Sequence, residues 1–188
     1  MNHPRPMRAD ARRNRERLLE AALKAFSTEA DADVTLERVA RDAGVGIGTL
    51  YRHFPTREAL VEEVYRTELT RLCESAPRLS AQLPPVEALR AWMEAFIDYL
   101  ATKRGLAEAL RAVIAAGGRP FAHSRELLLG ALGGLLRAGE ADGLRTDAEP
   151  EDVLVALNGI SLAAGEPAQR EQAGRLLDLI VDGLRARA

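Results

Sequence analysis

The chain has 188 residues and a net charge of −2, which excludes a uniformly basic coat for nucleic acid. Apolar residues make up 47%, enough for a sizeable core, which excludes an intrinsically disordered chain. One cysteine, Cys73, cannot form an internal disulfide, and three histidines are too few for a zinc-type cluster. No apolar run is long enough to span a bilayer, and no signal peptide is recognisable at the amino terminus, so a cytoplasmic protein is expected.

Charge is distributed unevenly along the chain. Residues 1–57 contain 11 basic and 8 acidic side chains, whereas residues 58–188 contain 15 basic and 20 acidic ones. A polyanion would therefore be attracted to the amino-terminal part and repelled by the rest. Six arginines fall within the first 17 residues. A flexible basic arm over 1–11 that only aids solubility would have the same composition, and charge alone does not distinguish the two.

The amino-terminal part is predicted to consist of helices separated by clear breaks. Thr35 is suited to cap a helix, Gly44 to form a turn with a left-handed backbone, Pro55 to end a helix and Thr56 to cap the next. Apolar residues at spacings of three and four support this division. The expected helices are 12–28, 36–43, 47–54 and a long one after residue 56, which is followed by a loop bracketed by Pro77, Pro84 and Pro85.

The rest of the sequence also has the pattern of helices, and no alternating strand pattern of useful length is present. Five further segments carry apolar residues on one helical face: 86–102, 105–116, 122–141, 150–164 and 168–187. An all-α protein of about nine helices is therefore predicted.

The stretch between Thr35 and Arg57 is the most informative. A short helix, a glycine turn and a second short helix over 36–55 describe a helix-turn-helix, whose second helix enters the DNA major groove. On a helical wheel, Leu50 and Phe54 share the face that can pack on the core. The opposite face carries small and hydrogen-bonding residues, namely Gly48, Thr49, Arg52 and His53.

This stretch resembles the TetR family of bacterial transcriptional regulators. The resemblance is carried by Ala-Gly-Val at 43–45, by Gly-Thr-Leu-Tyr-Arg-His-Phe at 48–54, and by Thr35, Arg57 and Leu60. The stretch at 101–110 resembles the subgroup of SbtR-type regulators. The resemblance implies a DNA-binding domain over 12–57 and an effector-binding and dimerisation domain over 58–188, with the arm (1–11) preceding both.

The resemblance also implies which residues contact the DNA backbone. Thr49, Tyr51 and His53 match positions that contact phosphates or neighbouring bases. Thr35 matches a phosphate-contacting cap, and Arg57 matches a phosphate-binding basic residue.

Base readout is less conventional in this sequence. Ile47 and Gly48 match positions that face base edges, yet neither offers a side-chain hydrogen bond, and Gly46 replaces a serine cap that is common in the family. Readout is therefore expected to rely on Arg52, Thr49, apolar contact by Ile47 and DNA shape.

A single recognition helix reads too few base pairs to find one genomic site, so a homodimer on a palindromic operator is expected. In the family, the last two helices pair with their copies, which implies a dimer interface. The expected interface residues are Leu154, Leu157, Leu177, Ile180, Val181 and Leu184. The same side chains could instead close the core of one subunit.

A small-molecule effector is expected in the carboxy-terminal part, because an apolar pocket with a few polar groups is the usual form of such a site. The candidate lining residues are Trp92, Phe96, Phe121, His123 and Asn158. Trp92 and Phe96 also fit ordinary core packing, since they lie on an apolar stripe.

Taken together, these features predict a DNA-binding transcriptional regulator that is a repressor released by an effector. We expect no catalytic residues, no metal and no cofactor, because His3, His53 and His123 lie in the arm, in the motif and in a loop. Two alternatives stay open: an activator of the same family, and a helical dimeric interaction module without specific DNA binding. Only the two DNA-binding classes predict duplex affinity that falls steeply with salt.

Overall fold

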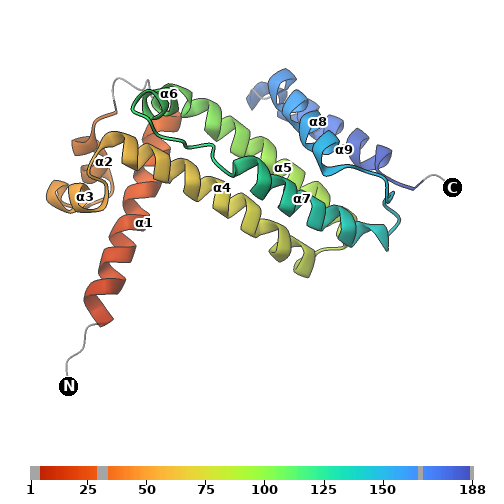
Figure 1. The fold of residues 1–188 in the computed structure, drawn as a ribbon, viewed down its shortest axis with the longest axis horizontal. Coiled ribbons are helices and arrows are strands. Elements are labelled where there is room, and N and C mark those ends of the chain that lie inside the picture. The colour runs from red at the N-terminus through yellow and green to blue at the C-terminus, as the bar shows by residue number, and fades with distance from the viewer. Residues whose placement is uncertain (1–4, 29–33, 165–166, 187–188) are drawn as a thin grey trace. The chain divides into compact units, whose positions relative to one another are not determined.

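The structure is a computed structural model that describes residues 5–28, 34–164 and 167–186 (Figure 1). Within these residues it contains nine α-helices and no strand, which confirms the all-α prediction. The helices are α1 (Arg5–Thr28), α2 (Leu36–Asp42), α3 (Ile47–His53), α4 (Arg57–Gln82), α5 (Pro85–Gly105), α6 (Ala107–Ala115), α7 (Ser124–Glu140), α8 (Pro150–Ala163) and α9 (Arg170–Gly183). A turn of 3-10 helix, Pro167–Gln169, precedes α9.

Packing divides the chain into two compact units, which are described separately. Unit 1 contains the chain up to Thr67 together with Lys103–Pro120, and unit 2 contains Glu68–Thr102 and the chain from Phe121 onward. The first turns of α4 and all of α6 therefore pack with α1–α3. The division at residue 57 stays a prediction about function rather than a description of these packing units.

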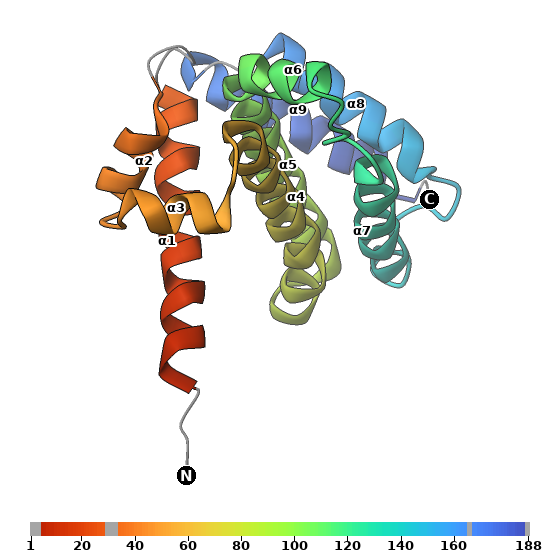
Figure 2. The same ribbon diagram turned by 60° about the vertical axis from the view of Figure 1, so that its left-hand side comes forward.

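In unit 1, the helix-turn-helix rests on one face of α1. Helix α1 contacts both α2 and α3, as the turned view shows (Figure 2). Leu18, Ala22 and Phe26 recur every four residues on α1 and are all buried, as are Val39 of α2 and Leu50 of α3. Because Leu50 anchors α3 on this core, the opposite face of α3 is left exposed.

Capping and turn residues in unit 1 are placed as the sequence predicts. The Thr35 hydroxyl accepts a hydrogen bond from the backbone N–H of Arg38 at 3.3 Å, and Thr56 caps α4 by accepting one from Ala59 N–H at 3.1 Å. Gly44 adopts a φ of 62°, a backbone conformation that residues with a Cβ rarely adopt. These contacts fix where α2 ends and where α4 begins.

Helix α1 begins earlier than the sequence predicts. It starts at Arg5, so residues 5–11, expected as a flexible arm, are helical, while residues 1–4 of that arm lie outside the described part. Arg13 pairs with Asp10 and Arg12 with Glu16, at the spacings that stabilise a helix. Arg12 and Arg13 therefore support the helix as well as a basic surface.

In unit 2, α4 continues through Pro77 to Gln82, so the expected loop beginning at this proline is wrong. A proline inside a helix cannot donate a backbone hydrogen bond, so local backbone chemistry alone does not favour this continuation. The indole N–H of Trp92 donates to the carbonyl oxygen of Leu72 at 3.1 Å and ties α4 to α5. Trp92 is fully buried and stacks on Phe96, with ring centroids 5.7 Å apart.

None of the helices in the described segments is both long enough and apolar enough to cross a bilayer.

Candidate nucleic-acid interface

The exposed face of α3 is formed by the residues that the sequence assigns to DNA. Ile47 is 38% exposed and Tyr51 45% exposed, and Gly48 and Arg52 are exposed as well. Thr49 is half-buried at the edge of this face. The face thus combines a guanidinium, two hydroxyls and a backbone without a side chain at Gly48, which suits both base edges and phosphates.

The carboxy-terminal end of α3 is held by aromatic packing. Phe54, directly after the helix, is buried, and the guanidinium of Arg15 lies over its ring at 5.5 Å. The rings of His53 and Phe54 have centroids 6.2 Å apart, and His53 is half-buried. His53 is therefore positioned by the core while part of its ring remains open to solvent.

The two remaining predicted phosphate contacts lie at the starts of neighbouring helices. Thr35 is exposed while it caps α2, so its hydroxyl already serves a structural role. Arg57, in the first turn of α4, is half-buried with its guanidinium 4.8 Å from the centre of the Phe26 ring. This stacking orients a cation beside a helix N-terminus, where an anion is favoured.

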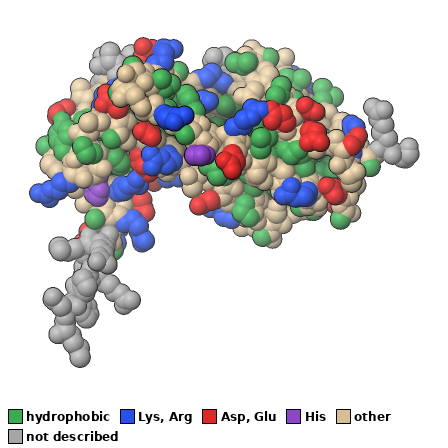
Figure 3. Space-filling view, viewed as in Figure 1, with side chains coloured by type: hydrophobic (Ala, Val, Ile, Leu, Met, Phe, Trp, Pro, Cys, Tyr) green, Lys and Arg blue, Asp and Glu red, His purple; other side chains and the backbone are tan. Residues whose placement is uncertain are grey.

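Basic side chains surround these elements. In the space-filling view, Lys and Arg side chains gather along the lower edge of the α1–α3 region, with a smaller number of acidic ones among them (Figure 3). Arg17 of α1 lies close to the turn, since its Nη1 would be 3.6 Å from a Cβ placed on Gly44. The region therefore presents the positive charge that a polyanion requires.

The predicted effector residues do not come together. Trp92 and Phe96 are buried in the core, whereas Phe121, His123 and Asn158 are exposed. His123 adopts a left-handed φ of 64° in the loop before α7. The amide of Asn158 donates to the carbonyl oxygen of Leu154 at 2.7 Å. None of these five side chains lines either of the two grooves described next.

Unit 2 contains an apolar groove between α4 and α7, with a volume of about 510 Å³. Small side chains create it, and a Cβ placed on Gly130 or Gly134 would meet nothing within 4 Å. The lining residues are Ala76, Pro77, Ser80, Ala81, Gly130, Ala131, Gly134, Leu135 and Ala138. Gly130 and Gly134 are visible in the sequence, but glycines inside a helix are equally compatible with room for a ligand and with close helix packing.

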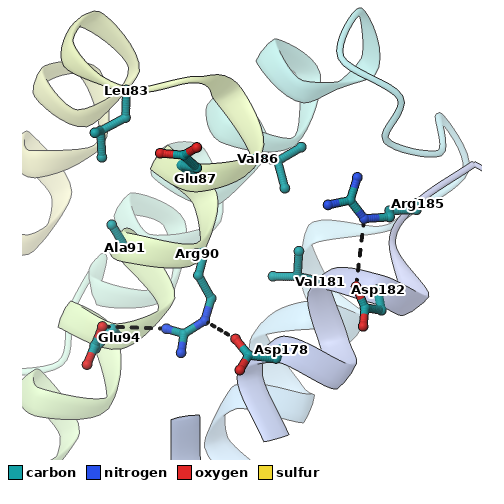
Figure 4. A pocket seen from close by; sticks show the side chains of 10 residues that line it. All are labelled: Leu83, Val86, Glu87, Arg90, Ala91, Glu94, Asp178, Val181, Asp182 and Arg185. Atoms are coloured by element: carbon teal, nitrogen blue, oxygen red, sulfur yellow. Dashed lines mark hydrogen bonds and ion pairs between the residues drawn. The ribbon is translucent and has the colours of Figure 1, made fainter. Parts of the chain in front are cut away.

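A second groove, of about 610 Å³, lies between α5 and α9 (Figure 4). Arg90 of α5 crosses this groove. Its Nε donates a hydrogen bond to Asp178 at 2.7 Å, and its Nη2 donates one to the carbonyl oxygen of Gly174 at 3.3 Å. Its Nη1 lies 3.5 Å from the carboxylate of Glu94. Val86 and Val181 form apolar walls beside Arg90. Arg90 therefore links α5 to α9 within unit 2.

The predicted dimer residues lie mostly inside the subunit. Leu154, Leu157, Leu177, Val181 and Leu184 are buried and Ile180 is half-buried, so packing within one chain already accounts for them. The exposed apolar side chains of α8 and α9 are their neighbours: Val155 (61%), Leu162 (83%) and Leu179 (66%). The apolar stripe of each helix predicted burial correctly but did not say which side chains remain available to a partner.

Other chemistry is sparse in the described residues. Cys73 is half-buried, and burial, with a smaller effect of Glu74, raises its pKa from about 9 to about 11, so the thiol is protonated at neutral pH. No group of three or more His, Cys, Asp or Glu side chains that could hold a metal is found among the residues that the structure describes.

Comparison with known proteins agrees with this geometry in both units. Residues 18–64 match the family described as bacterial regulatory proteins, tetR family, and residues 84–186 match the transcriptional regulator SbtR-like, C-terminal domain. A crystal structure of a TetR transcriptional regulator from Streptomyces coelicolor is 55% identical, covering 93% of this chain and 99% of that one with a TM-score of 0.87. A crystal structure of a TetR transcription regulatory protein from Mycobacterium vanbaalenii is 34% identical. The match covers 96% of this chain and 100% of that one, with a TM-score of 0.79.

A curated HTH-type transcriptional regulator of Staphylococcus aureus is 41% identical over 63 residues. The match spans about a third of that relative, 34% of its length and 34% of this chain.

Proposed function

Because this chain belongs to the TetR family of bacterial transcriptional regulators, we propose that it is a repressor. A small-molecule effector would release it from its operator. The family consists of DNA-binding proteins rather than enzymes. The observation that carries the DNA-binding part is the exposed face of α3, where Arg52, Tyr51 and Gly48 are held outward by the burial of Leu50. Repression needs no further partner, because a protein bound over a promoter blocks polymerase by itself. The protein would act in the cytoplasm, where bacterial DNA lies.

In this proposal, α3 enters the major groove and contacts base edges through Ile47, Gly48, Thr49 and Arg52. The phosphate contacts are assigned to Tyr51, His53, Thr35 and Arg57. The stacking of Arg57 on Phe26 supports its assignment, since it fixes the position of the cation before DNA arrives.

The proposed repressor is a homodimer on a palindromic operator, with an interface formed by α8 and α9. Support comes from Val155, Leu162 and Leu179, which expose large apolar surfaces on these two helices. Burying such surfaces against a second copy is favourable by about 25 cal/mol per Å². A two-fold dimer would also present two copies of α3 to successive major grooves, and so read enough base pairs to find one site.

The effector is assigned to the apolar groove between α4 and α7, so an apolar or amphipathic small molecule is expected. A ligand in this groove would press on α4 near Ala76 and Pro77. Because α4 begins at Arg57, directly after the helix-turn-helix, its displacement would change the separation of the two recognition helices. A coupling free energy of about 1–3 kcal/mol would weaken operator binding about 5–150-fold.

The first test is a fluorescence anisotropy titration of the protein against its own upstream intergenic duplex, over a series of salt concentrations. Tight binding that exceeds binding to a scrambled duplex, and that falls steeply with salt, is expected. Arg52→Ala and Tyr51→Ala should each weaken it, whereas Arg111→Ala, an exposed arginine on α6, should not. Equal and weak binding to every duplex, including those in a genomic library, would contradict a site-specific regulator.

The effector is tested by screening apolar compounds for release of the bound duplex. Gly130→Leu is the variant that tests the site, because the leucine side chain would fill the groove without a clash at its Cβ. The variant should bind the operator and resist release. Release of the variant at the wild-type effector concentration would exclude this groove as the effector site.

A further inference from the structure

The amino-terminal end of α3 presents an aliphatic side chain to solvent. Ile47 is 38% exposed although isoleucine is among the side chains most often buried, and its neighbour on the same face, Tyr51, is 45% exposed. Leu50 and Phe54 take all the core positions of this segment, with 0% and 3% exposure. Ile47 is therefore only partly covered by the protein core, and it lies one helical turn before Tyr51, a proposed DNA contact.

The backbone on both sides of Ile47 is bare. Gly46 precedes it and Gly48 follows it, and a Cβ added to either glycine would meet nothing within 4 Å. Ile47 therefore carries the one side chain among residues 46–48, at the start of α3. The bare backbone on both sides of it permits a close approach to the floor of the major groove.

The chemistry of the major groove restricts what Ile47 can contact favourably. Guanine, adenine and cytosine present hydrogen-bond donors or acceptors there, and only thymine adds an apolar group, its C5 methyl. Ile47 has no hydrogen-bonding group, so packing it against the amino group of cytosine or adenine would leave that donor without a partner.

We propose that Ile47 selects a thymine in each half-site of the operator by packing against its C5 methyl. This inference rests on the proposed function, since it names a base that the DNA-binding face requires. Burying one methyl contributes enough to change affinity about fourfold, so loss of the methyl in both half-sites should weaken binding about 15-fold.

The experiment starts by enriching duplexes from a random library with the full-length protein. Each thymine of the selected site is then replaced by deoxyuridine, which lacks only the methyl, and binding is measured by fluorescence anisotropy. One position in each half-site should lose about fourfold in affinity. Because the substitution changes both subunits of the proposed dimer, Ile47→Ala should bind the thymine duplex about 15-fold more weakly. It should show no additional loss at that deoxyuridine, because both changes remove the same contact.

A matched control is available in Ile114→Ala, which truncates an isoleucine of α6 that is 48% exposed. This variant should bind like the wild type and keep its full sensitivity to deoxyuridine. Deoxyuridine tolerated at every position, or a loss that persists undiminished in Ile47→Ala, would overturn the inference while leaving site-specific binding intact. If no duplex is enriched, the proposed function itself fails, and the assignment of Ile47 fails with it.

Discussion

Gly46 occupies the N-cap position of the recognition helix α3, so no side chain there satisfies the amide groups of the first turn. Its backbone, with φ −64° and ψ 140°, is open to other residues, and a Cβ would meet nothing within 4 Å. Gly46→Ser should therefore raise the free energy of unfolding by about 0.5–1 kcal/mol, through a cap hydrogen bond and a less flexible unfolded chain.

Urea denaturation followed by circular dichroism measures this change. Gly46→Ala is the control, since it restricts the unfolded chain without adding a cap, and it should give the smaller gain. A serine variant no more stable than the alanine variant would mean that no cap hydrogen bond forms.

The thiol of Cys73 has an altered pKa, which gives a second prediction at the scale of one residue. Burial raises the pKa of its thiol to about 11, so its alkylation rate by iodoacetamide should keep rising with pH up to about 11 rather than levelling near 9. The folded state holds this proton more tightly than the unfolded chain does. The associated stability is therefore complete below about pH 9 and is lost as the pH rises from 9 to 11.

Comparing urea denaturation of the wild type and Cys73→Ala at about pH 8 and about pH 10 isolates this contribution from other groups that titrate there. The wild type should lose more stability than the variant over that interval. An alkylation rate that levels near pH 9 would show that the thiol is less buried in solution.

Between elements, Arg90 makes a polar connection from α5 to α9, beside a second one in which Arg170 of α9 binds Asp98 of α5. The Arg90 side chain is 25% exposed, and it contacts Asp178 and the Gly174 carbonyl of α9. Arg90→Ala should lower the free energy of unfolding by about 1 kcal/mol, a value limited by the 64% exposure of Asp178. Arg111→Ala, which removes an exposed arginine paired with Glu108 within α6, should cost less, about 0.5 kcal/mol or below.

The two variants can be compared by thermal unfolding, where 1 kcal/mol corresponds to about 2–4 °C for a chain of this size. A double-mutant cycle with Asp178→Ala then gives the share of the ion pair itself. Equal effects of Arg90→Ala and Arg111→Ala would mean that the contacts of Arg90 with α9 add no more stability than an exposed ion pair does.

Sequence patterns predicted most elements correctly, because local signals determine them. Thr35, Gly44 and Thr56 have the cap and turn roles that their chemistry dictates. Pro77 shows where local signals fail: a proline usually ends a helix, but α4 continues past it, and the tertiary bond from Trp92 to the neighbouring Leu72 carbonyl is invisible in the sequence.

The candidate site divides in the same way. The helical wheel predicted the exposure of Gly48 and Arg52, because they lie opposite the buried Leu50. It did not predict that Thr49 and His53 are half-buried, since that depends on the elements around α3. The groove between α4 and α7 depends instead on which helices meet. The sequence therefore leaves Trp92 and Phe96 as candidates both for a ligand site and for the core, and in the structure both are buried and neither lines the groove.

At the scale of the whole molecule, the proposed dimer connects local chemistry to recognition. One copy of α3 contacts a few base pairs, so affinity for a palindromic site depends on holding two copies together. The exposed apolar side chains of α8 and α9 would supply that association. Disrupting them should therefore weaken operator binding without altering any residue of the DNA-binding face.

Leu162→Glu tests this dependence, because Leu162 is 83% exposed and its replacement would place two carboxylates in the proposed two-fold interface. The variant should be a monomer by light scattering after size-exclusion chromatography, and its operator affinity should fall about 100-fold or more as the second half-site is lost. Leu127→Glu, on α7 and 48% exposed in the subunit, should remain dimeric with unchanged affinity. A Leu162→Glu protein that stays dimeric would place the dimer interface elsewhere, and one that is monomeric yet binds the operator with wild-type affinity would show that recognition does not require the dimer.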